Sequence, residues 1–591
     1  MKTLNPTWNI ADMFENDEAW EKKLAEVAAN IDLLAGQKGH AAASAEELLK
    51  TAHLYEQCNM GLEQVYTYAS CKYHPDLSVD SAKGMVERVM TEISRFGEKT
   101  AFLAPELMQE SLEKFEQFCA ECPELAVYRH YAEDFFSKKA HVLDQKGEEM
   151  LVRMNDMGES FSKVYDDLTI NDMEFPEIEG PDGKPVKVSE AGYGAALQNP
   201  DRRYRRDFYE GLLRTYGKNI RTISSNYTGA VKLDVYSAKS RNYQTAREKA
   251  LADNHVPEAV YDNLIQTVRA NTAPLQEYVS LRKKLLGIED FHFYDFFVPI
   301  VKDVAKEYPY EEGKELVLKA TAVLGEDYNE VMRHAVDDRW IDIYPGKNKM
   351  TGAYSTGAYG FHPYMLLNYD NTLEDVFTLG HELGHSMHTY YSSEKQPYIY
   401  ANYSIFCAEV ASTTNEMLLY HDLLGKAETK EEKALLLSKH LDDIRSTFYR
   451  QTMFADFEYQ THKLVEEGAP LLPSTLCEIH RKLNEDYYGP EFAADETISY
   501  EWARIPHFYR CFYVYQYATG ISAAIAISRR IRELGQPAVE DYRKFLASGS
   551  SAHPIDLLKI AGVDMASPQP VLDTVAEFAE TLAELKKVLG A

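Results

Sequence analysis

The N-terminal region, up to about residue 110, places apolar side chains at helical spacing among many charges. The pattern is clear from Trp20 to Leu34 and again from Ala52 to Tyr68, where apolar positions recur every three or four residues. A helix with this pattern buries one stripe and leaves its other faces in water. The spacing therefore predicts a set of packed helices.

Two segments interrupt the helical spacing with β-strand signals. Residues 174–188 read EFPEIEGPDGKPVKV, in which alternating apolar residues flank a Gly-Pro-Asp-Gly turn, as in a β-hairpin. The tyrosine- and glycine-rich segment 349–369 has β-preferring residues in its second half and predicts one or two strands. Helical spacing resumes from Asp201 and ends with the helix Val571–Leu589. The expected fold is mainly α-helical with a small β-sheet.

These changes of pattern suggest three parts. We expect a helical region at 1–110, a helical segment that ends in the hairpin at 111–190, and a larger domain at 191–591. A helix is expected to start at Asn371, with Glu374 three places later in a capping box. Its apolar stripe comprises Leu373, Val376, Phe377, Gly380, Gly384 and Met387.

Composition narrows the class of protein. Hydrophobic residues make up 45% and charged residues 26% of the 591 positions, which is typical of a globular protein and excludes a disordered or collagen-like chain. The 63 Lys and Arg against 93 Asp and Glu give a net charge of −30, which repels phosphate backbones and anionic lipid. We therefore expect neither nucleic acid nor membrane as a partner. The basic cluster Arg202, Arg203, Arg205 and Arg206 predicts a solvated face paired with acidic neighbours.

The cysteines and the N-terminus indicate the compartment. Seven scattered cysteines do not resemble a secreted disulfide framework, and the one C-x-x-C pair, Cys119 and Cys122, has no second pair nearby. The N-terminal residues have no apolar core of a signal peptide, and the most apolar later run, Gly520–Ser528, is too short to cross a bilayer. A cytoplasmic protein is the expectation.

One motif carries specific chemistry. His381-Glu382-Leu383-Gly384-His385 is an H-E-x-x-H sequence, and residues four apart on a helix lie one turn above each other. Two imidazoles can therefore hold one metal ion, with Glu382 beside it to activate a water molecule as a general base. The pattern predicts one Zn²⁺ per chain and hydrolysis of a peptide bond.

A catalytic zinc usually has three protein ligands and one open position, so a third ligand is expected downstream. The extended motif H-E-x-x-H-x-x-G-x-x-H is excluded because position 388 is His388 and position 391 is Tyr391. A carboxylate is the alternative, with Glu394, Glu409 and Glu416 as near candidates. The next helix, Ser404–Leu419, places Glu409, Ser412 and Glu416 along one face, and we select Glu409.

His388 lies near the metal-bearing face, seven residues after His381. A fourth protein ligand would close the open coordination position, so we interpret His388 as a non-ligand. It is either a donor beside the site or a packed imidazole, and we group it with the candidate substrate-binding residues.

Several segments together closely resemble the oligoendopeptidase F branch of the thimet oligopeptidase family of zinc peptidases. They are WIDIYPGKNKMTGAYS, LNYDNTLEDVFTLGHELGHSMH, YSIFCAEVASTTNEMLL and WARIPHFYRCFYVYQYATG, in the order of the family. Weaker similarity in Tyr128-Arg129-His130-Tyr131 and KLLGIEDFHFYDFFVP extends the resemblance over nearly the whole chain.

The resemblance implies roles for individual residues. Glu409 matches the third zinc ligand of the family, in agreement with its choice from spacing. His507 and a tyrosine of FYVYQY match the residues that donate hydrogen bonds to the oxyanion of the tetrahedral intermediate. Tyr513 and Tyr517 fit the pattern best, and Tyr515 stays open as an alternative.

The resemblance also has implications for substrate binding and shape. Gly352, Ala353 and Tyr354 match a segment near the active site that can pair with an extended substrate, with a structural turn as the alternative. Members of the family have a gluzincin-like core within a large helical shell that encloses a deep channel. Short unfolded peptides enter such a channel, whereas folded proteins are excluded.

The expected function is therefore zinc-dependent hydrolysis of internal peptide bonds in short oligopeptides. One alternative is a zinc carboxypeptidase or dipeptidase on a related helical fold, which cuts only at chain ends. Another is a helical peptide-binding protein in which the metal is only structural. The sequence leaves the cleavage preference and the oligomeric state undetermined.

Overall fold

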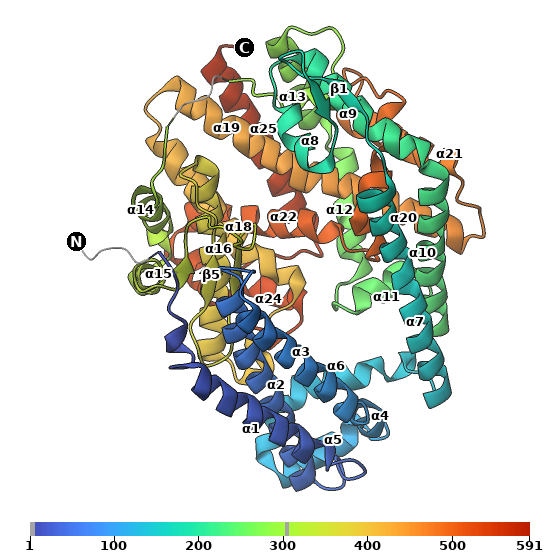
Figure 1. The fold of residues 1–591 in the computed structure, drawn as a ribbon, viewed down its shortest axis with the longest axis vertical. Coiled ribbons are helices and arrows are strands. Elements are labelled where there is room, and N and C mark those ends of the chain that lie inside the picture. The colour runs from blue at the N-terminus through green and yellow to red at the C-terminus, as the bar shows by residue number, and fades with distance from the viewer. Residues whose placement is uncertain (1–5, 302–305) are drawn as a thin grey trace. The chain divides into compact units, whose positions relative to one another are not determined.

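The computed structural model describes residues 6–301 and 306–591. It is mainly helical with two small β-sheets, which confirms the predicted fold class (Figure 1). The chain divides into two compact units. Unit 1 comprises Met1–Val142, Lys306–Leu423 and Ile527–Gly562, and unit 2 comprises Leu143–Ala305, Leu424–Ala526 and Val563–Ala591.

Unit 1 contains the N-terminal helices and the H-E-x-x-H helix. Its helices are α1 (Asp17–Ala35), α2 (Ala45–Tyr73), α3 (Asp80–Thr100), α4 (Leu103–Leu107), α5 (Leu112–Glu121), α6 (Arg129–Ser137), α14 (Tyr310–Thr321), α15 (Glu326–Asp337), α16 (Leu373–Lys395), α17 (Tyr398–Ala401), α23 (Gln536–Leu546) and α24 (Pro554–Ile560). Helix α18 (Ile405–Lys426) also belongs to unit 1 except for its last three residues. Its strands are β3 (Ile341–Asp342), β4 (Tyr354–Thr356) and β5 (Tyr364–Leu366).

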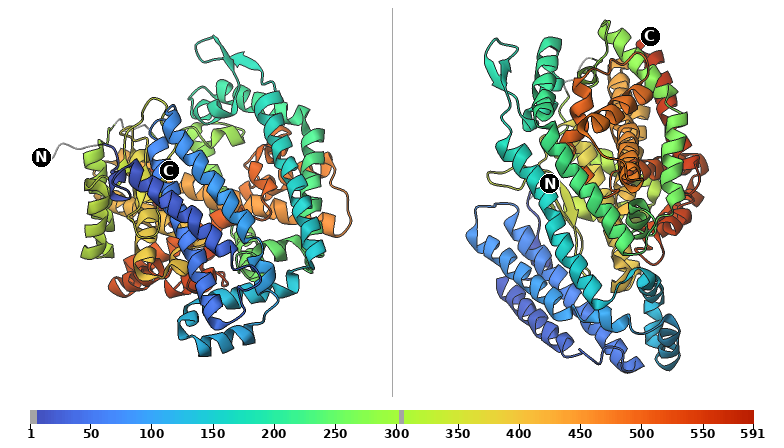
Figure 2. Two further views of the ribbon diagram at one scale, coloured as in Figure 1. Left: turned by 60° about the horizontal axis from the view of Figure 1, so that its bottom comes forward. Right: turned by 90° about the vertical axis from the view of Figure 1, so that its right-hand side faces the viewer.

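Helices α1, α2 and α3 pack side by side, in blue in Figures 1 and 2. The predicted helical stretches Trp20–Leu34 and Ala52–Tyr68 lie within α1 and α2. Trp20 is fully buried between these helices, and its indole N–H donates to the carbonyl of Val65 at 2.9 Å. The apolar stripe of α1 thus packs as the helical spacing predicted.

The three-stranded sheet connects this bundle to the rest of unit 1. The strand order is β3-β5-β4, with β5 parallel to β3 and antiparallel to β4, so β4 lies at one edge. Tyr364 and Leu366 of β5 are buried in one cluster with Trp8, Tyr68 and other core residues of the N-terminal region. The predicted strands in 349–369 are confirmed.

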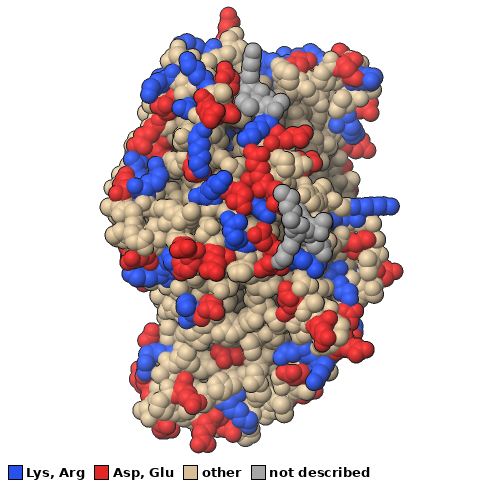
Figure 3. Space-filling view, turned by 90° about the vertical axis from the view of Figure 1, so that its left-hand side faces the viewer, with Lys and Arg blue, Asp and Glu red and all other residues tan. Residues whose placement is uncertain are grey.

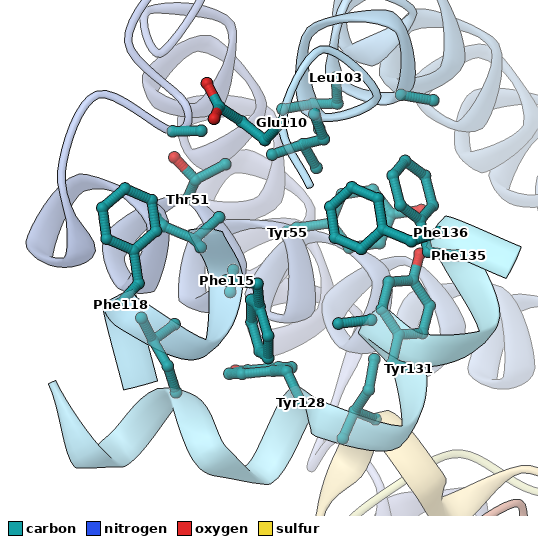
Figure 4. A pocket seen from close by; sticks show the side chains of 18 of the residues that line it. Thr51, Tyr55, Leu103, Glu110, Phe115, Phe118, Tyr128, Tyr131, Phe135 and Phe136 are labelled. Carbon is teal, nitrogen blue, oxygen red and sulfur yellow. The ribbon is translucent and has the colours of Figure 1, made fainter. Parts of the chain in front are cut away.

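An apolar cavity of about 240 Å³ lies among α2, α4, α5 and α6 (Figure 4). Aromatic rings of Phe115, Tyr128, Tyr131 and Phe136 line it. Among the residues described there, the lining includes no histidine or cysteine. The metal chemistry predicted from the sequence therefore belongs to another part of unit 1.

Unit 2 is also built of long helices. These are α7 (Gln145–Asp166), α8 (Glu190–Leu197), α9 (Arg202–Lys218), α10 (Ile220–Ser240), α11 (Ala246–Ala252), α12 (Glu258–Ala270), α13 (Ala273–Leu286), α19 (Lys430–Ile444), α20 (Arg450–Glu466), α21 (Pro473–Tyr488) and α25 (Gln569–Leu589). Helix α22 (Tyr515–Leu534) begins in unit 2 and ends in unit 1. Helices α7 and α10 run side by side (Figure 1), and α20 packs on α10.

The predicted hairpin is present in unit 2. Strands β1 (Glu177–Glu179) and β2 (Pro185–Lys187) pair antiparallel, with Ile178 opposite Val186. Gly183 has a φ of +78° in the connecting turn, a conformation that glycine adopts without a steric penalty.

The basic cluster at 202–206 pairs with acidic neighbours as predicted, but the prediction of a solvated face is wrong for Arg205. Arg205 is buried, and its guanidinium bonds the fully buried carboxylate of Asp295 at 2.9 Å. Arg202 bonds the second oxygen of the same carboxylate at 2.8 Å. A buried carboxylate needs ionic partners, and the spacing of the arginines alone did not indicate which of them would meet one.

A second buried ionic group in unit 2 has a pH-dependent effect on stability. The carboxylate of Glu501 bonds Arg450 at 2.6 Å and the imidazole of His480 at 3.1 Å. Burial alone disfavours the charged carboxylate, but Arg450 and His480 outweigh it and lower the pKa of Glu501 to about 2. The ionised form is therefore favoured in the folded state.

We expect Glu501→Gln to lose this contribution. A carboxyl group with a lowered folded pKa stabilises the protein above its unfolded pKa of 4.5, and the stabilisation is lost as the pH falls toward 2. At neutral pH the free energy of unfolding should be lower for the variant than for wild type. This difference between the two proteins should be about 3 kcal/mol larger at neutral pH than at pH 2. Urea unfolding over this pH range measures the difference, and Glu496→Gln, at an exposed carboxylate, is the control. A constant difference between wild type and Glu501→Gln would contradict the prediction.

The structure shows how the charged residues and the cysteines are arranged. Acidic and basic side chains are interspersed on the face drawn in Figure 3. All seven cysteines are free of disulfides, the pair Cys119 and Cys122 included. Among the described residues, none of the helices combines the length and apolar character needed to span a bilayer.

Candidate metal centre

Helix α16 carries the H-E-x-x-H motif, and its start differs by one residue from the prediction. Thr372 is the N-cap, and its hydroxyl accepts from the backbone N–H of Asp375 at 3.2 Å. The carboxylate of Asp375 accepts in return from the N–H of Thr372 at 2.8 Å. Asn371 precedes the helix with a φ of +62°, so it cannot be the N-cap. The predicted box of Asn371 and Glu374 is therefore wrong by one position.

The motif presents its two histidines on one face of α16. The rings of His381 and His385 lie 4.8 Å apart and nearly perpendicular, as expected for positions four apart on a helix. Neighbouring residues on other faces, including Leu383 and Met387, are buried. The hydroxyls of Ser355 in β4 and Ser386 in α16 lie 2.8 Å apart, which fixes the sheet against the helix.

Glycine 384 allows α18 to approach α16 closely. A Cβ atom at this position would lie 2.5 Å from the Cα of Ser412 and 2.7 Å from the carbonyl oxygen of Ala411. Both are backbone atoms, so no side-chain rotation can relieve the contact. The glycine of the motif therefore sets the distance between the two helices that carry the candidate ligands.

Glutamate 409 of α18 reaches both histidines. Its Oε2 lies 3.3 Å from Nε2 of His381 and 3.5 Å from Nε2 of His385. The hydroxyl of Ser412, one turn later, donates to the same oxygen at 3.1 Å. Two ligand atoms about 2.0–2.1 Å from one ion at a tetrahedral angle lie about 3.3–3.4 Å apart. Both distances from Glu409 are close to this value, and His381, His385 and Glu409 form a candidate metal site.

Glutamate 416 has a role that spacing alone did not assign. Its Oε1 lies 2.5 Å from Nδ1 of His381, so it orients the ring and leaves Nε2 directed toward Glu409. From the sequence, Glu416 was only an alternative ligand. Its position two turns after Glu409 on the same helix face was the available signal.

The charges around the histidines favour a cation. Burial disfavours protonation of His381, but hydrogen bonds to Glu409 and Glu416 outweigh it and raise its pKa to about 10. Hydrogen bonds from both histidines lower the pKa of Glu409. The site therefore keeps an ionised carboxylate next to imidazoles and attracts positive charge.

Glutamate 382 lies on the same helix in a dry environment. Its side chain is 6% exposed, and burial raises its pKa despite the opposing effect of His381 and His385. Its Oε2 has no hydrogen-bond partner among the described residues. A buried carboxylate oxygen without a partner is a suitable proton acceptor for a molecule that enters the site.

We expect Glu416→Gln to lower zinc affinity by about 10–100-fold, because the carboxylate that orients His381 loses its charge. Competition with a chromophoric chelator measures the dissociation constant. Glu394→Gln, at an exposed position near the end of the same helix, is the matched control. Equal zinc affinity in wild type and Glu416→Gln would contradict a role for Glu416 in orienting the ligand.

His388 is buried on α16, three residues after His385. Its ring stacks on that of Tyr403 with a centroid separation of 3.7 Å and packs against Phe545. Burial lowers its pKa to about 3, so the ring is neutral. This placement supports the packed imidazole among the alternatives, and direct contact with a substrate stays a prediction.

The candidate substrate-binding segment lies at the edge of the sheet. Gly352 has a φ of +83°, and Tyr354 begins the edge strand β4. The hydroxyl of Tyr354 bonds Nδ1 of His74 at 2.6 Å, and its ring packs near Trp8. The side chain of Tyr354 is thus engaged with the N-terminal core, and the carbonyl of Gly352 accepts from the side-chain amide of Asn368 at 2.8 Å.

Unit 2 contains the remaining predicted site residues. His507, in the short 3-10 helix Pro506–Tyr509, has its Nε2 3.3 Å from the hydroxyl of Tyr517. The ring of Tyr513 lies 6.2 Å from His507 and 5.6 Å from Tyr517. Tyr515 points the other way, since it is buried and packs on Tyr261. The structure therefore brings His507, Tyr513 and Tyr517 together and separates Tyr515 from them.

Several family models and known proteins are similar to this chain over most of its length. The sequence model "Peptidase family M3" matches residues 195–577, and "Oligopeptidase F" matches residues 106–175. Oligopeptidase PepF of Bacillus subtilis is 40% identical over 583 residues, which cover 99% of this chain and 87% of that protein. Group B oligopeptidase PepB of Streptococcus agalactiae is 36% identical over 583 residues, which cover 99% of this chain and 97% of that protein.

Two solved structures are also similar to this chain in sequence and fold. Oligoendopeptidase-F from Enterococcus faecium is 32% identical, with a TM-score of 0.75 and coverage of 97% of this chain and 99% of that one. A crystal structure from Chlamydophila abortus is 33% identical, with a TM-score of 0.92 and coverage of 99% of both chains.

Proposed function

The chain belongs to peptidase family M3 as an oligopeptidase F, and from this membership we propose how its own residues perform the reaction. It is a zinc endopeptidase that cleaves oligopeptides. The observation that carries the proposed residue roles is the arrangement of His381, His385 and Glu409 around one point, with Glu382 beside them.

We assign one catalytic zinc per chain to these three ligands. When bound, zinc acts as a Lewis acid on the scissile carbonyl and makes water a competent nucleophile near pH 7. His381, His385 and Glu409 would hold this ion through two imidazoles and one carboxylate. Glu416 and Ser412 hold His381 and Glu409 in place through the contacts described above.

Glu382 is proposed as the general base. It accepts a proton from the attacking water and later delivers that proton to the leaving amine, so no covalent acyl-enzyme forms. Its burial and its unpartnered Oε2 support this role.

His507 and Tyr517 are proposed to donate hydrogen bonds to the oxyanion of the tetrahedral intermediate, with Tyr513 beside them. Their support is the resemblance of WARIPHFYRCFYVYQYATG and their mutual contacts within unit 2. Gly352 and Ala353 are proposed to pair with the backbone of an extended peptide, supported by the edge position of β4.

We also propose a domain division, a cellular location and a class of partner. The division into 1–110, 111–190 and 191–591 has support from the separate family matches at 106–175 and 195–577. A cytoplasmic location has support from the odd number of cysteines, which are all unpaired. Short unfolded peptides are the proposed partners, since the relatives are named oligopeptidases.

A doubly end-blocked, internally quenched peptide tests endopeptidase action. We expect internal cleavage that stops with a chelator and returns with zinc. Mass analysis of the products identifies the bonds that are cut. A strict exopeptidase would leave this peptide intact and trim the free-ended version. A binding protein with a structural metal would cut neither peptide. The variant His385→Ala is the negative control, because it lacks a zinc ligand.

A further inference from the structure

Unit 2 contains a second cluster of metal-ligating side chains. Asp234 of α10, His462 of α20 and Cys511, which follows the short helix Pro506–Tyr509, each present one ligand atom, and the three atoms lie within 4.8 Å of one another. We propose that these residues form a second divalent-metal site, of the zinc class, distinct in composition from the H-E-x-x-H site.

The imidazole is oriented as a metal ligand would be. Nδ1 of His462 lies 2.9 Å from the carbonyl oxygen of Glu458, which can only accept, so Nδ1 carries the proton. A neutral His462 then has its lone pair on Nε2, directed at the cluster. A histidine that donates one ring nitrogen to a carbonyl and offers the other to an ion is the usual arrangement in metal sites.

The distance between His462 and Asp234 matches one in the first site. Nε2 of His462 lies 3.3 Å from Oδ2 of Asp234, the same separation as between His381 and Glu409. Two acceptor atoms at this distance need either a proton or a cation between them. A metal ion with ligands at about 2.0–2.1 Å meets the requirement at a tetrahedral angle.

The donor set selects the class of ion. One thiolate, one imidazole and one carboxylate favour zinc or a similar borderline metal over magnesium or calcium, which prefer oxygen alone. His462 is buried, whereas Asp234 and Cys511 are partly exposed. The cluster therefore combines a desolvated, anchored imidazole with two partly exposed ligand side chains.

The turn that positions Cys511 is itself anchored. Phe512 has a φ of +50°, a strained value for a non-glycine residue, and its N–H donates to the carboxylate of Glu458 at 2.6 Å. Glu458 is fully buried, lies one helical turn before His462, and its Oε2 has no hydrogen-bond partner among the described residues. The hydrogen bond from Phe512 to Glu458 therefore fixes the backbone next to Cys511.

A metal at this site would have a positioning role. Cys511 lies between His507 and Tyr513 in the sequence, and the ion would tie this segment to α10 and α20. Occupancy would therefore hold the segment that carries the proposed oxyanion donors. The inference does not depend on those roles, because it concerns metal binding within unit 2.

Cobalt distinguishes the two sites in the full-length chain, because only the second contains sulfur. After metal removal, titration with Co²⁺ should bind two equivalents and produce a near-ultraviolet thiolate-to-cobalt charge-transfer band. The band should persist in Glu409→Gln, which lacks a ligand of the first site, and in Cys477→Ala, a partly exposed cysteine elsewhere in unit 2. It should be absent in Cys511→Ala and in His462→Gln.

Wild-type protein alone can overturn the proposal. One bound equivalent without a charge-transfer band would show that Asp234 and His462 form only an ion pair. A band that survives in Cys511→Ala would place the sulfur ligand elsewhere and equally reject the site. Because both readouts are direct measures of binding, a loss of peptidase activity would not be mistaken for support.

Discussion

Replacing Glu382 with Gln is expected to lower kcat by about 10²–10⁴-fold while zinc remains bound. Glutamine keeps the size and polarity of the side chain but cannot accept the proton of the attacking water. The imidazoles of His381 and His385 and the carboxylate of Glu409 are unchanged, so the ion keeps its ligands. The loss should appear in kcat rather than in zinc content.

Turnover of the end-blocked peptide and metal analysis of the same preparation measure the two quantities. Glu394→Gln is the matched control, since it makes the same chemical change at an exposed position of α16. Near-normal turnover in Glu382→Gln would reject the general base. Loss of zinc together with activity would instead assign Glu382 a structural part in holding the ion.

The second large effect is expected from Gly384→Ala. The new Cβ would lie 2.5–2.8 Å from backbone atoms of Ala411 and Ser412, so α18 must move away from α16. Overpacking of this kind costs about 1–3 kcal/mol of stability. Since Glu409 lies on α18 one turn before Ser412, the shift also displaces the third ligand from the histidines. Zinc affinity and activity should fall together.

Gly380→Ala on the same helix is a close control. Its Cβ would meet no atom nearer than 3.6 Å, at the side chain of Leu419, which is an ordinary contact. Chelator competition and thermal unfolding of the two variants give the comparison. If Gly384→Ala binds zinc as tightly as Gly380→Ala, the close approach of the helices does not control the site.

Some features follow from local pattern and could be inferred without the structure. The helix of the motif, the strands in 349–369 and the hairpin at 174–188 depend on residues near one another in sequence. The histidine pair depends on helix geometry alone, because residues four apart share a face. Glu409 followed from the need for a third ligand and from its place on the next helix face.

The family resemblance added residues that no periodicity could single out. His507 and the tyrosines of FYVYQY are such a case, since a tyrosine-rich helix start is also typical of packing. The resemblance left Tyr515 open as an alternative. Only the packing of Tyr515 on Tyr261 separated it from the group of Tyr513, Tyr517 and His507.

The helical class, the metal motif and its zinc-peptidase chemistry could thus be inferred from the sequence. The tertiary structure decided which charged groups meet: Glu416 with His381, Arg205 with Asp295, and Asp234 with His462 across 228 positions of chain. Helix and strand periodicities arise from backbone geometry within a few residues, whereas such pairs arise from how separate elements pack. A single sequence specifies that packing only through the fold as a whole.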